Sequence, residues 1–225
     1  MSLLTFFGSY TQTPYTLQPK FLNLNNAHLI GDGNSYMAGH GYAPAISYLM
    51  GMEPFNSNGA TMVNFGVGGQ STQDMLADQA TQVLPAMQPG VVNLFLIMEG
   101  GNDLYYGRTP QQALANTKTY CRNIKNIAAQ NNIDAWVLIY NLIPRNQPDI
   151  NGTVADFNTN MESYNLLISG DTSNDWDEVI DLKNEPLFSA YNAGGYDADE
   201  IHPNGTGQEQ MAVLTHEKIM SLQKR

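Results

Sequence analysis

Five short apolar runs, separated by longer stretches of helical periodicity, constrain the fold of this chain more than any other feature. The third run, residues 91–98, is almost continuously apolar, which is typical of a central parallel strand covered on both faces. The other runs lie at 27–30, 61–65, 135–140 and 178–182. Helical patterns occupy residues 72–87, 110–130, 154–168 and 206–222. This alternation predicts an α/β fold, a three-layer α/β/α sandwich around a five-stranded parallel sheet.

The length of 225 residues fits a single hydrophobic core, which we expect to span residues 26–225. Residues 1–25 do not follow the strand–helix rhythm and are rich in Thr, Tyr, Gln and Pro. They are predicted to form an N-terminal arm. The sequence leaves open whether this arm wraps its own domain, packs on a neighbouring subunit of a homo-oligomer, or joins a larger assembly.

Composition excludes several classes of partner. A formal net charge of -11 disfavours nucleic acid and acidic membrane surfaces, because both require a basic face. A single cysteine, Cys121, allows no internal disulfide, no metal-ligand spacing is present, and we expect neither a metal nor a cofactor. No run is long enough to span a membrane, and residues 1–7 lack the features of a signal peptide. A cytoplasmic location, or a virion or extracellular one reached by a non-classical route, stays open.

Polar residues follow most of the predicted strands. In a parallel α/β sheet the ligand site lies at the carboxyl ends of the strands. Ser35 follows the first strand on a glycine-containing turn, glycines follow the second at 66–69, and Asn102 follows the third. A serine at the start of a helix is exposed for attack, and nearby N–H groups can stabilise an oxyanion. Taken singly, each of these residues is explained equally well as a turn or a helix cap.

A carboxylate and a histidine near the C-terminus favour a catalytic interpretation. Asp199 precedes His202 by three residues, close enough for its carboxylate to accept from Nδ1 and leave Nε2 free as a base. A serine hydroxyl needs such a partner because it is a poor nucleophile at neutral pH. The sequence therefore contains the components of a Ser-His-Asp triad.

With these residues in view, the chain resembles the SGNH hydrolases, also called the GDSL family, over residues 26–222. Gly33-Asn34-Ser35 with Gly39 matches the first family block, and Gly100-Gly101-Asn102-Asp103 matches the third. Asp199 and His202 match the last. The resemblance implies the flavodoxin-like SGNH fold, with Ser35 as nucleophile and His202 as base.

The resemblance also implies an oxyanion hole. Its donors would be the N–H of Ser35, the N–H of a glycine in the second block and the side-chain amide of Asn102. The glycine maps best to Gly69, with Gly66 and Gly68 as alternative registers.

One position departs from the family pattern. Asn34 stands where the family usually has Asp, and Gly31-Asp32-Gly33 offers a rival register in which Gly33 would replace the nucleophile. The Ser35 register is preferred because it alone preserves Gly39. The rival register would make the protein a catalytically inactive relative.

Four further residues are candidates for the substrate pocket: Asn34, His40, Tyr105 and Tyr106. For His40 a surface or helix-packing role is favoured over a pocket role, and for the two tyrosines packing and pocket roles are weighed equally.

The sequence predicts a serine esterase that hydrolyses carboxylic esters with acetyl or other short acyl groups, on a small molecule or a carbohydrate. The alternatives are a weak or inactive glycan-binding or virion module of the same fold, and an acyltransferase that uses the same triad.

Overall fold

The computed structural model describes residues 22–223, and its centre is a parallel sheet. The strands are β1 (His28–Gly33), β2 (Thr61–Asn64), β3 (Val92–Met98), β4 (Asp134–Tyr140) and β5 (Glu178–Ile180). They pair in the order β2-β1-β3-β4-β5, and every pair is parallel. The predicted five-stranded α/β fold is thereby confirmed.

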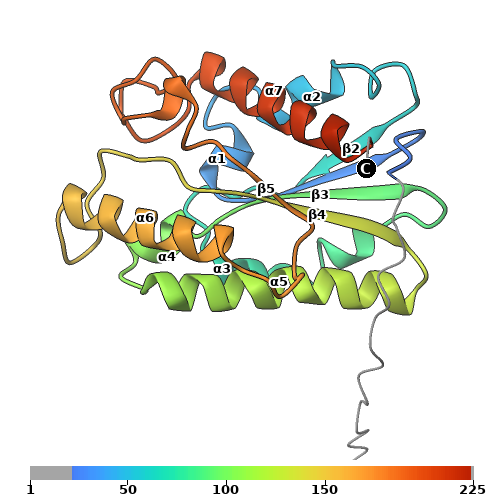
Figure 1. The fold of residues 1–225 in the computed structure, drawn as a ribbon, viewed down its shortest axis with the longest axis horizontal. Helices are drawn as coiled ribbons and strands as arrows, with labels where there is room; N and C mark the ends of the chain where they lie inside the picture. The colour runs from blue at the N-terminus through green and yellow to red at the C-terminus, as the bar shows by residue number, and fades with distance from the viewer. Residues whose placement is uncertain (1–21, 224–225) are drawn as a thin grey trace, which may run out of the picture.

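Helices cover both faces of the sheet (Figure 1). On one face lie α1 (Ser35–Ala38), α2 (Ala45–Met50) and α7 (Gly205–Leu222). On the other lie α3 (Thr72–Asp78), α4 (Gly101–Tyr105), α5 (Pro110–Gln130) and α6 (Val154–Ser169). Two short 3-10 turns, Leu84–Ala86 and Pro186–Phe188, complete the described elements. The three layers follow from the need to bury both faces of a parallel sheet.

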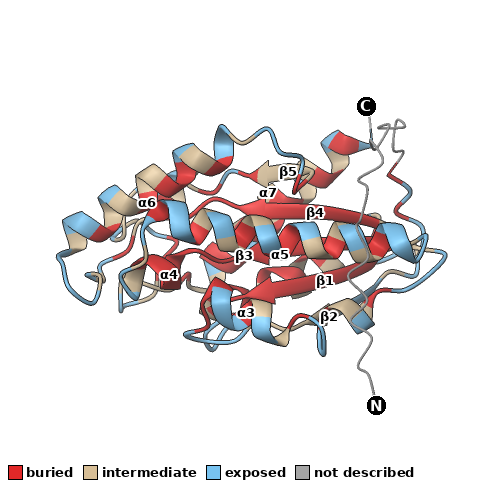
Figure 2. Cartoon of the chain, turned by 90° about the horizontal axis from the view of Figure 1, so that it is seen from below, coloured by how far each residue is buried: buried red, intermediate tan, exposed pale blue. Residues whose placement is uncertain are grey.

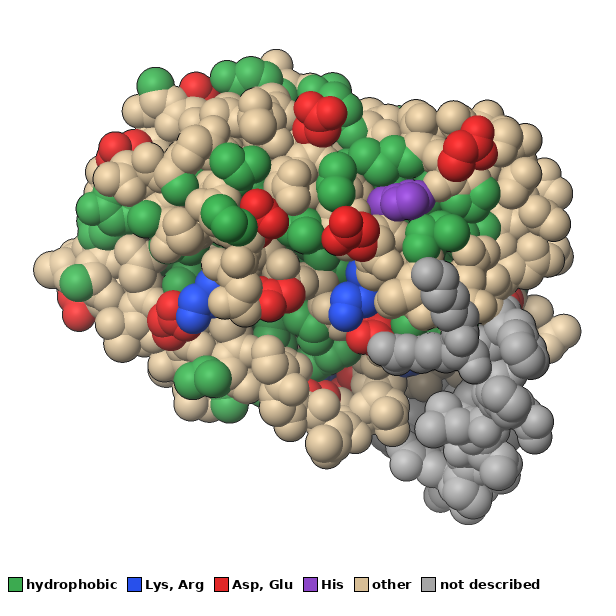
Figure 3. Space-filling model, turned by 45° about the horizontal axis from the view of Figure 1, so that its top comes forward, with side chains coloured by type: hydrophobic (Ala, Val, Ile, Leu, Met, Phe, Trp, Pro, Cys, Tyr) green, Lys and Arg blue, Asp and Glu red, His purple; other side chains and the backbone are tan. Residues whose placement is uncertain are grey.

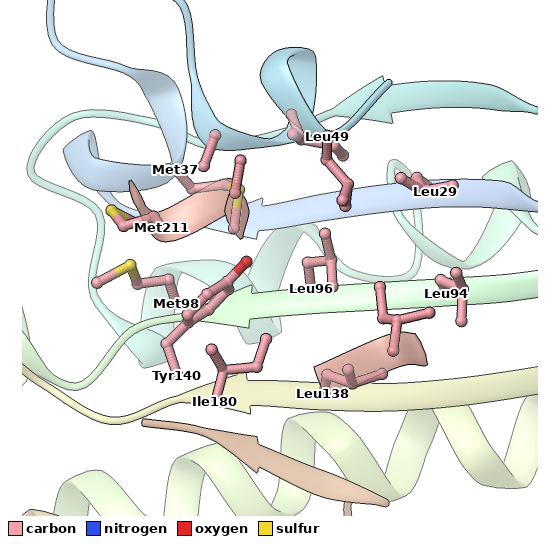
Figure 4. Packing of buried hydrophobic residues seen from close by; sticks show 14 of the residues in the cluster. Leu29, Met37, Leu49, Leu94, Leu96, Met98, Leu138, Tyr140, Ile180 and Met211 are labelled. Atoms are coloured by element: carbon pink, nitrogen blue, oxygen red, sulfur yellow. The ribbon is translucent and has the colours of Figure 1, made fainter. Parts of the chain in front are cut away.

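Alternate residues of each strand enter two separate cores. In β3, Leu94, Leu96 and Met98 face the α2–α7 layer, as Figure 4 shows, whereas Phe95 and Ile97 face the α5–α6 layer. All seven residues of β3 are buried. Figure 2 shows the same division from the side of α5, whose inner face is buried while its outer face is exposed.

The predicted helix at 72–87 is wrong in its second half. Regular α-helix ends at Asp78, and turns lead to the 3-10 segment Leu84–Ala86. Pro85 keeps the 3-10 segment from continuing as an α-helix, because proline lacks the N–H that a helix interior requires and disfavours helical geometry in the residue before it. The predicted helix at 110–130 is confirmed, with Thr109 as N-cap and Pro110 in the first turn.

The geometry of β1 bears on the choice between the two registers of the first block. Strand β1 runs on through Gly33, so the rival Gly31-Asp32-Gly33 segment lies inside the sheet. Gly33 has a φ of +150°, and a Cβ built there would lie 2.2 Å from the carbonyl oxygen of Met98. No nucleophilic side chain fits at that position, whereas Ser35 lies beyond the strand as the first residue of α1, after the N-cap Asn34.

Residues 1–21 of the predicted N-terminal arm lie outside the described residues, so its proposed role in oligomerisation stays a prediction. Within the described part of the arm, Leu22 and Leu24 are buried in the core beneath α7. Among the helices of residues 22–223, none is both long and apolar enough to cross a bilayer.

The strand order reverses direction between β1 and β3, so the chain leaves these neighbouring strands toward opposite faces. Such a switch point opens a crevice at the carboxyl edge of the sheet. Ser35 follows β1 and Asn102 follows β3, which puts both at this crevice.

Candidate active site

Ser35 is the first residue of α1, a single helical turn fixed by its neighbours. The Asn34 side-chain oxygen accepts from the N–H of Tyr36 at 2.9 Å and caps the helix. Tyr36 and Met37 are buried beneath it. Asn34 therefore provides the capping acceptor that an aspartate would provide, and the half-buried Ser35 stands at a helix N-terminus.

His202 connects Ser35 to Asp199. Its Nε2 lies 2.9 Å from the Ser35 hydroxyl oxygen, and its Nδ1 lies 2.6 Å from Oδ2 of Asp199. The other carboxylate oxygen of Asp199 accepts from the backbone N–H groups of Ile201 and His202. The carboxylate thus fixes both the ring and the turn that carries it.

The electrostatics favour an ionised carboxylate beside a neutral imidazole. Desolvation alone would raise the pKa of Asp199, but hydrogen bonds from the backbone and ring of His202 and from Ile201 outweigh it and hold the pKa at about 2. Desolvation lowers the pKa of His202, against the opposing effect of Asp199. At neutral pH the imidazole is therefore free to accept a proton.

His40 contacts the base directly, although the sequence favoured a surface or helix-packing role. Its ring stacks on His202 with centroids 3.5 Å apart and planes 8° apart, and its Nε2 lies 3.7 Å from Asp199. The three residues could in principle offer ligand atoms to a metal ion. The stacked rings of His40 and His202 do not suit a shared metal ion. An imidazole binds a metal through a nitrogen lone pair that lies in the plane of its ring, and two nearly parallel planes do not converge on one ion.

Hydrogen bonds join the residues after β3 to the loop after β2, which approaches Ser35 at Gly68. Asn102 donates from Nδ2 to the carbonyl of Gln70 at 2.8 Å. The neighbouring carboxylate of Asp103 accepts from the N–H and hydroxyl of Thr72, at 2.9 and 2.7 Å. These bonds hold the loops after β2 and β3 at a fixed distance from one another.

The three candidate oxyanion glycines differ in availability. The N–H of Gly66 donates to the Asn64 side chain at 3.0 Å, so it is already used. Neither Gly68 nor Gly69 donates its N–H to another described residue, and the same holds for Ser35. Gly68 is close enough that a Cβ built on it would lie 3.9 Å from Cβ of Ser35, and Gly69 has a φ of +78°. Gly69 and Gly68 therefore both stay candidates.

Comparison with known families agrees with this arrangement. The model of the GDSL-like lipase/acylhydrolase family matches residues 31–210, most of the chain and every block described above. The chain belongs to this family. Membership makes it a hydrolase of carboxylic esters, as the sequence predicted.

Solved structures show the same fold at low sequence identity. TesA is 16% identical with a TM-score of 0.68, over 87% of this chain and 99% of that one. A psychrotrophic esterase from Pseudoalteromonas sp. is 14% identical, with a TM-score of 0.60, over 89% and 100%. An acetylxylan esterase from Geobacillus stearothermophilus is 15% identical, with a TM-score of 0.58, over 85% and 93%. A search of curated proteins found no match.

Of the two predicted pocket tyrosines of this acylhydrolase, Tyr106 contacts the loop after β2 and Tyr105 packs beside Tyr106. The hydroxyl of Tyr106 donates to the carbonyl of Gly69 at 2.9 Å, and its side chain is 45% exposed. Tyr105 is half-buried, with its ring centroid 5.2 Å from that of Tyr106. A pocket role for the two tyrosines stays a prediction.

Sequence reasoning did not single out Arg145, which the structure brings next to the residues that follow β3. Arg145 lies beyond the carboxyl end of β4, and its guanidinium donates to the carbonyl of Gly101 at 2.9 Å. The signal in the sequence was a charged residue just beyond a buried strand, at the edge where ligands bind. An arginine on the surface gives the same signal in the sequence, and only its burial in the structure distinguishes Arg145 from such a residue.

Proposed function

We propose that this acylhydrolase is a serine esterase that removes acetyl or other short acyl groups from a small-molecule or carbohydrate alcohol. The observation that carries the proposal is the continuous chain of hydrogen bonds from Ser35 through His202 to Asp199, at 2.9 and 2.6 Å. Such a chain lets a neutral histidine activate a serine hydroxyl.

In the proposed reaction, Nε2 of His202 takes the hydroxyl proton while Oγ of Ser35 attacks the ester carbonyl. The resulting oxyanion receives hydrogen bonds from the N–H groups of Ser35 and Gly69 and from the Asn102 amide. Collapse of this intermediate breaks the bond to the alkoxide, which leaves with the proton from His202. Water, deprotonated by the same histidine, then attacks the acyl-enzyme and releases the acid and free Ser35.

Support for a short acyl group comes from the rim of the site. Tyr106 is tied to Gly69 by its hydroxyl, so its ring is held beside the proposed oxyanion loop. No long amphipathic segment that could serve as a lid for a fatty acyl chain appeared in the sequence.

A polar alcohol suits the surface around this site. Tyr42 and Tyr106 are 40% and 45% exposed and combine an aromatic face with a hydroxyl. Figure 3 shows the molecule with its α2–α7 side turned forward, where acidic side chains lie scattered among uncharged ones and basic side chains are few. Together with the formal net charge of -11, this favours an uncharged hydroxylated substrate such as a sugar over an anionic one.

The inactive-module alternative rested on Asn34, on the polar surface and on the N-terminal arm. Because Asn34 caps α1 through its side-chain oxygen, the departure from aspartate preserves the turn that presents Ser35. The acyltransferase alternative differs only in the acceptor that resolves the acyl-enzyme, and product analysis with an added alcohol separates it from hydrolysis.

The first test is hydrolysis of p-nitrophenyl acetate by wild type, by Ser35→Ala and by Ser163→Ala, a matched change on the exposed side of α6. We expect a loss of about 10⁴-fold or more for Ser35→Ala, because the nucleophile is removed, and no change for Ser163→Ala. Comparable rates for wild type and Ser35→Ala would overturn the proposal.

Acyl length is tested by comparing acetyl with decanoyl esters of p-nitrophenol. Faster turnover of the acetyl ester supports the short-acyl assignment. Faster turnover of the decanoyl ester would contradict it while leaving the triad intact.

A further inference from the structure

The short segment after β4 contacts both sides of the site. The carbonyl of Pro144 accepts from the hydroxyl of Tyr196, and the N–H of Asn146 donates to the carbonyl of Glu200 at 2.9 Å. Both partners belong to the loop that carries Asp199 and His202. Between them, Arg145 turns inward, toward the residues that follow β3.

Arg145 is held in place on every side. Its side chain is 3% exposed, and its guanidinium carbon lies 4.0 Å from the centroid of the Phe157 ring. Its backbone N–H donates to the Asn158 side chain, whose amide donates back to the Arg145 carbonyl. An arginine in such a position costs desolvation energy, which here lowers its pKa. A buried cation held this firmly calls for an explanation.

Two contacts of its guanidinium go to neutral groups of the residues that follow β3, while Tyr36 and the buried carboxyl of Glu99 also interact with the cation. Nη2 donates to the carbonyl of Gly101 at 2.9 Å, and Nη1 lies 3.5 Å from the side-chain oxygen of Asn102. Nε has no hydrogen-bond partner. The cation is therefore directed at the strand end that carries the proposed oxyanion amide.

This contact fixes the orientation of the Asn102 amide. An asparagine side chain can rotate to exchange its oxygen and its NH₂ group at little cost in shape. The cation attracts the oxygen and repels the NH₂ group, while the Gln70 carbonyl accepts one N–H at 2.8 Å. The second N–H of Asn102 then stays available to a ligand.

We propose that Arg145 is a positioning residue that holds the Asn102 amide as an oxyanion donor. The inference rests on the proposed function and deepens it, because it assigns to the carboxyl end of β4 a role in transition-state stabilisation. Arg145 acts through Asn102 and does not touch the substrate. By drawing electron density toward the amide oxygen, the cation also makes the free N–H a stronger donor.

A double-mutant cycle tests this role with p-nitrophenyl acetate. Asn102→Ala is expected to lower kcat by about 100- to 1000-fold, the usual cost of one oxyanion donor. Arg145→Met keeps the length and removes the charge, and we expect kcat to fall by about 10- to 100-fold, the effect of a misplaced catalytic group, with KM little changed. In the Asn102→Ala background, Arg145→Met should have no further effect, because residues that act as a unit are not additive.

The rates are compared at a pH where the wild-type profile is flat, because the charge of Arg145 also lowers the pKa of His202. Arg122→Met is the matched control, since Arg122 pairs with Asp175 away from the site, and it should leave kcat unchanged. If Arg145→Met does not fold, the same cycle is run with Arg145→Lys, which keeps the charge but loses the paired N–H geometry.

Losses that multiply in the double variant would overturn the inference, because Arg145 would then act independently of Asn102. A rise in KM with kcat unchanged would overturn it equally. Failure of the proposed function has a different signature: wild type itself would not hydrolyse the ester, or would do so no faster than Ser35→Ala.

Discussion

The two sides of the proposed site are built differently. Ser35 and Asn102 follow buried strands of the sheet, and Arg145 lies beneath them, almost wholly buried. Asp199 and His202 lie in a loop outside any described helix or strand, and the side chains of Asp199 and His40 are 35% and 44% exposed.

The difference follows from what each side has to do. Oxyanion donors act only if they already point at the place where charge develops, so they need a rigid support. A base has to reach one hydroxyl, and a loop tied down by a few bonds is sufficient. Tyr36 provides one such bond, from its hydroxyl to the carbonyl of Ile201 at 2.7 Å.

Among the variants that distinguish the two sides, Asp199→Asn is expected to cause the largest loss of kcat. The amide cannot stabilise the imidazolium that forms during attack, and it favours the wrong tautomer of His202, so kcat should fall by about 10³- to 10⁴-fold. Steady-state kinetics on p-nitrophenyl acetate measure it. Asp197→Asn, in the same loop, is the control and should have little effect. A loss below tenfold would show that the loop works without the carboxylate.

A second expectation concerns pH. The proposed base works only when neutral, and burial lowers the pKa of His202, so the acid limb of kcat/KM should have its midpoint below 6.5. Below that midpoint the rate should fall about tenfold per pH unit. Asp199, with a pKa of about 2, stays ionised throughout this range. A midpoint above 7 would contradict the direction of the shift.

A smaller effect is expected from His40, which restrains the exposed side of the site by stacking on His202. His40→Ala should lower kcat by about two- to tenfold, the kinetic equivalent of one aromatic contact of about 0.5–1.5 kcal/mol. His40→Phe keeps a flat ring and should retain most of the rate. Equal losses in both variants would indicate a chemical role for the imidazole of His40.

The smallest effect on rate is expected from Asp32→Asn, beneath the turn that carries Ser35. This variant should instead change the pH dependence of stability. Burial raises the pKa of Asp32 to about 6, against hydrogen bonds from Tyr120 and Gly33. Because the folded state then holds this proton more tightly than the unfolded state, stability should fall by up to about 3 kcal/mol as pH rises from about 4 to 6.

Urea denaturation of wild type and Asp32→Asn at pH 4.5 and pH 7 tests this expectation. The loss of stability between pH 4.5 and pH 7 should be smaller in the variant than in wild type, because Glu99 and Asp103, whose pKa values burial also raises, keep contributing in both proteins. The kcat of the variant should stay close to wild type. A variant whose stability changes with pH as much as that of wild type would contradict the expectation.

Much of the fold could be predicted because parallel strands carry a strong local signal. The continuous apolar run of β3 and the spacing of the long helices α5, α6 and α7 reflect burial that every residue in them shares. The helix predicted at 72–87 ends at Asp78 in the structure, although the apolar spacing continues beyond it. The short helices α2 and α4 span five or six residues, too few to show a period.

The candidate site shows the same contrast between what local sequence predicts and what it misses. The sequence by itself determined which chemical groups are present, since Ser35, Asn102, Asp199 and His202 occur in family blocks of fixed order. Tertiary structure alone decided which groups meet. It places Gly33 inside β1, stacks His40 on His202 and turns Arg145 inward. The physical reason is that these contacts join segments up to about 160 residues apart, and the direction of a side chain after a strand depends on neighbours that no local pattern encodes.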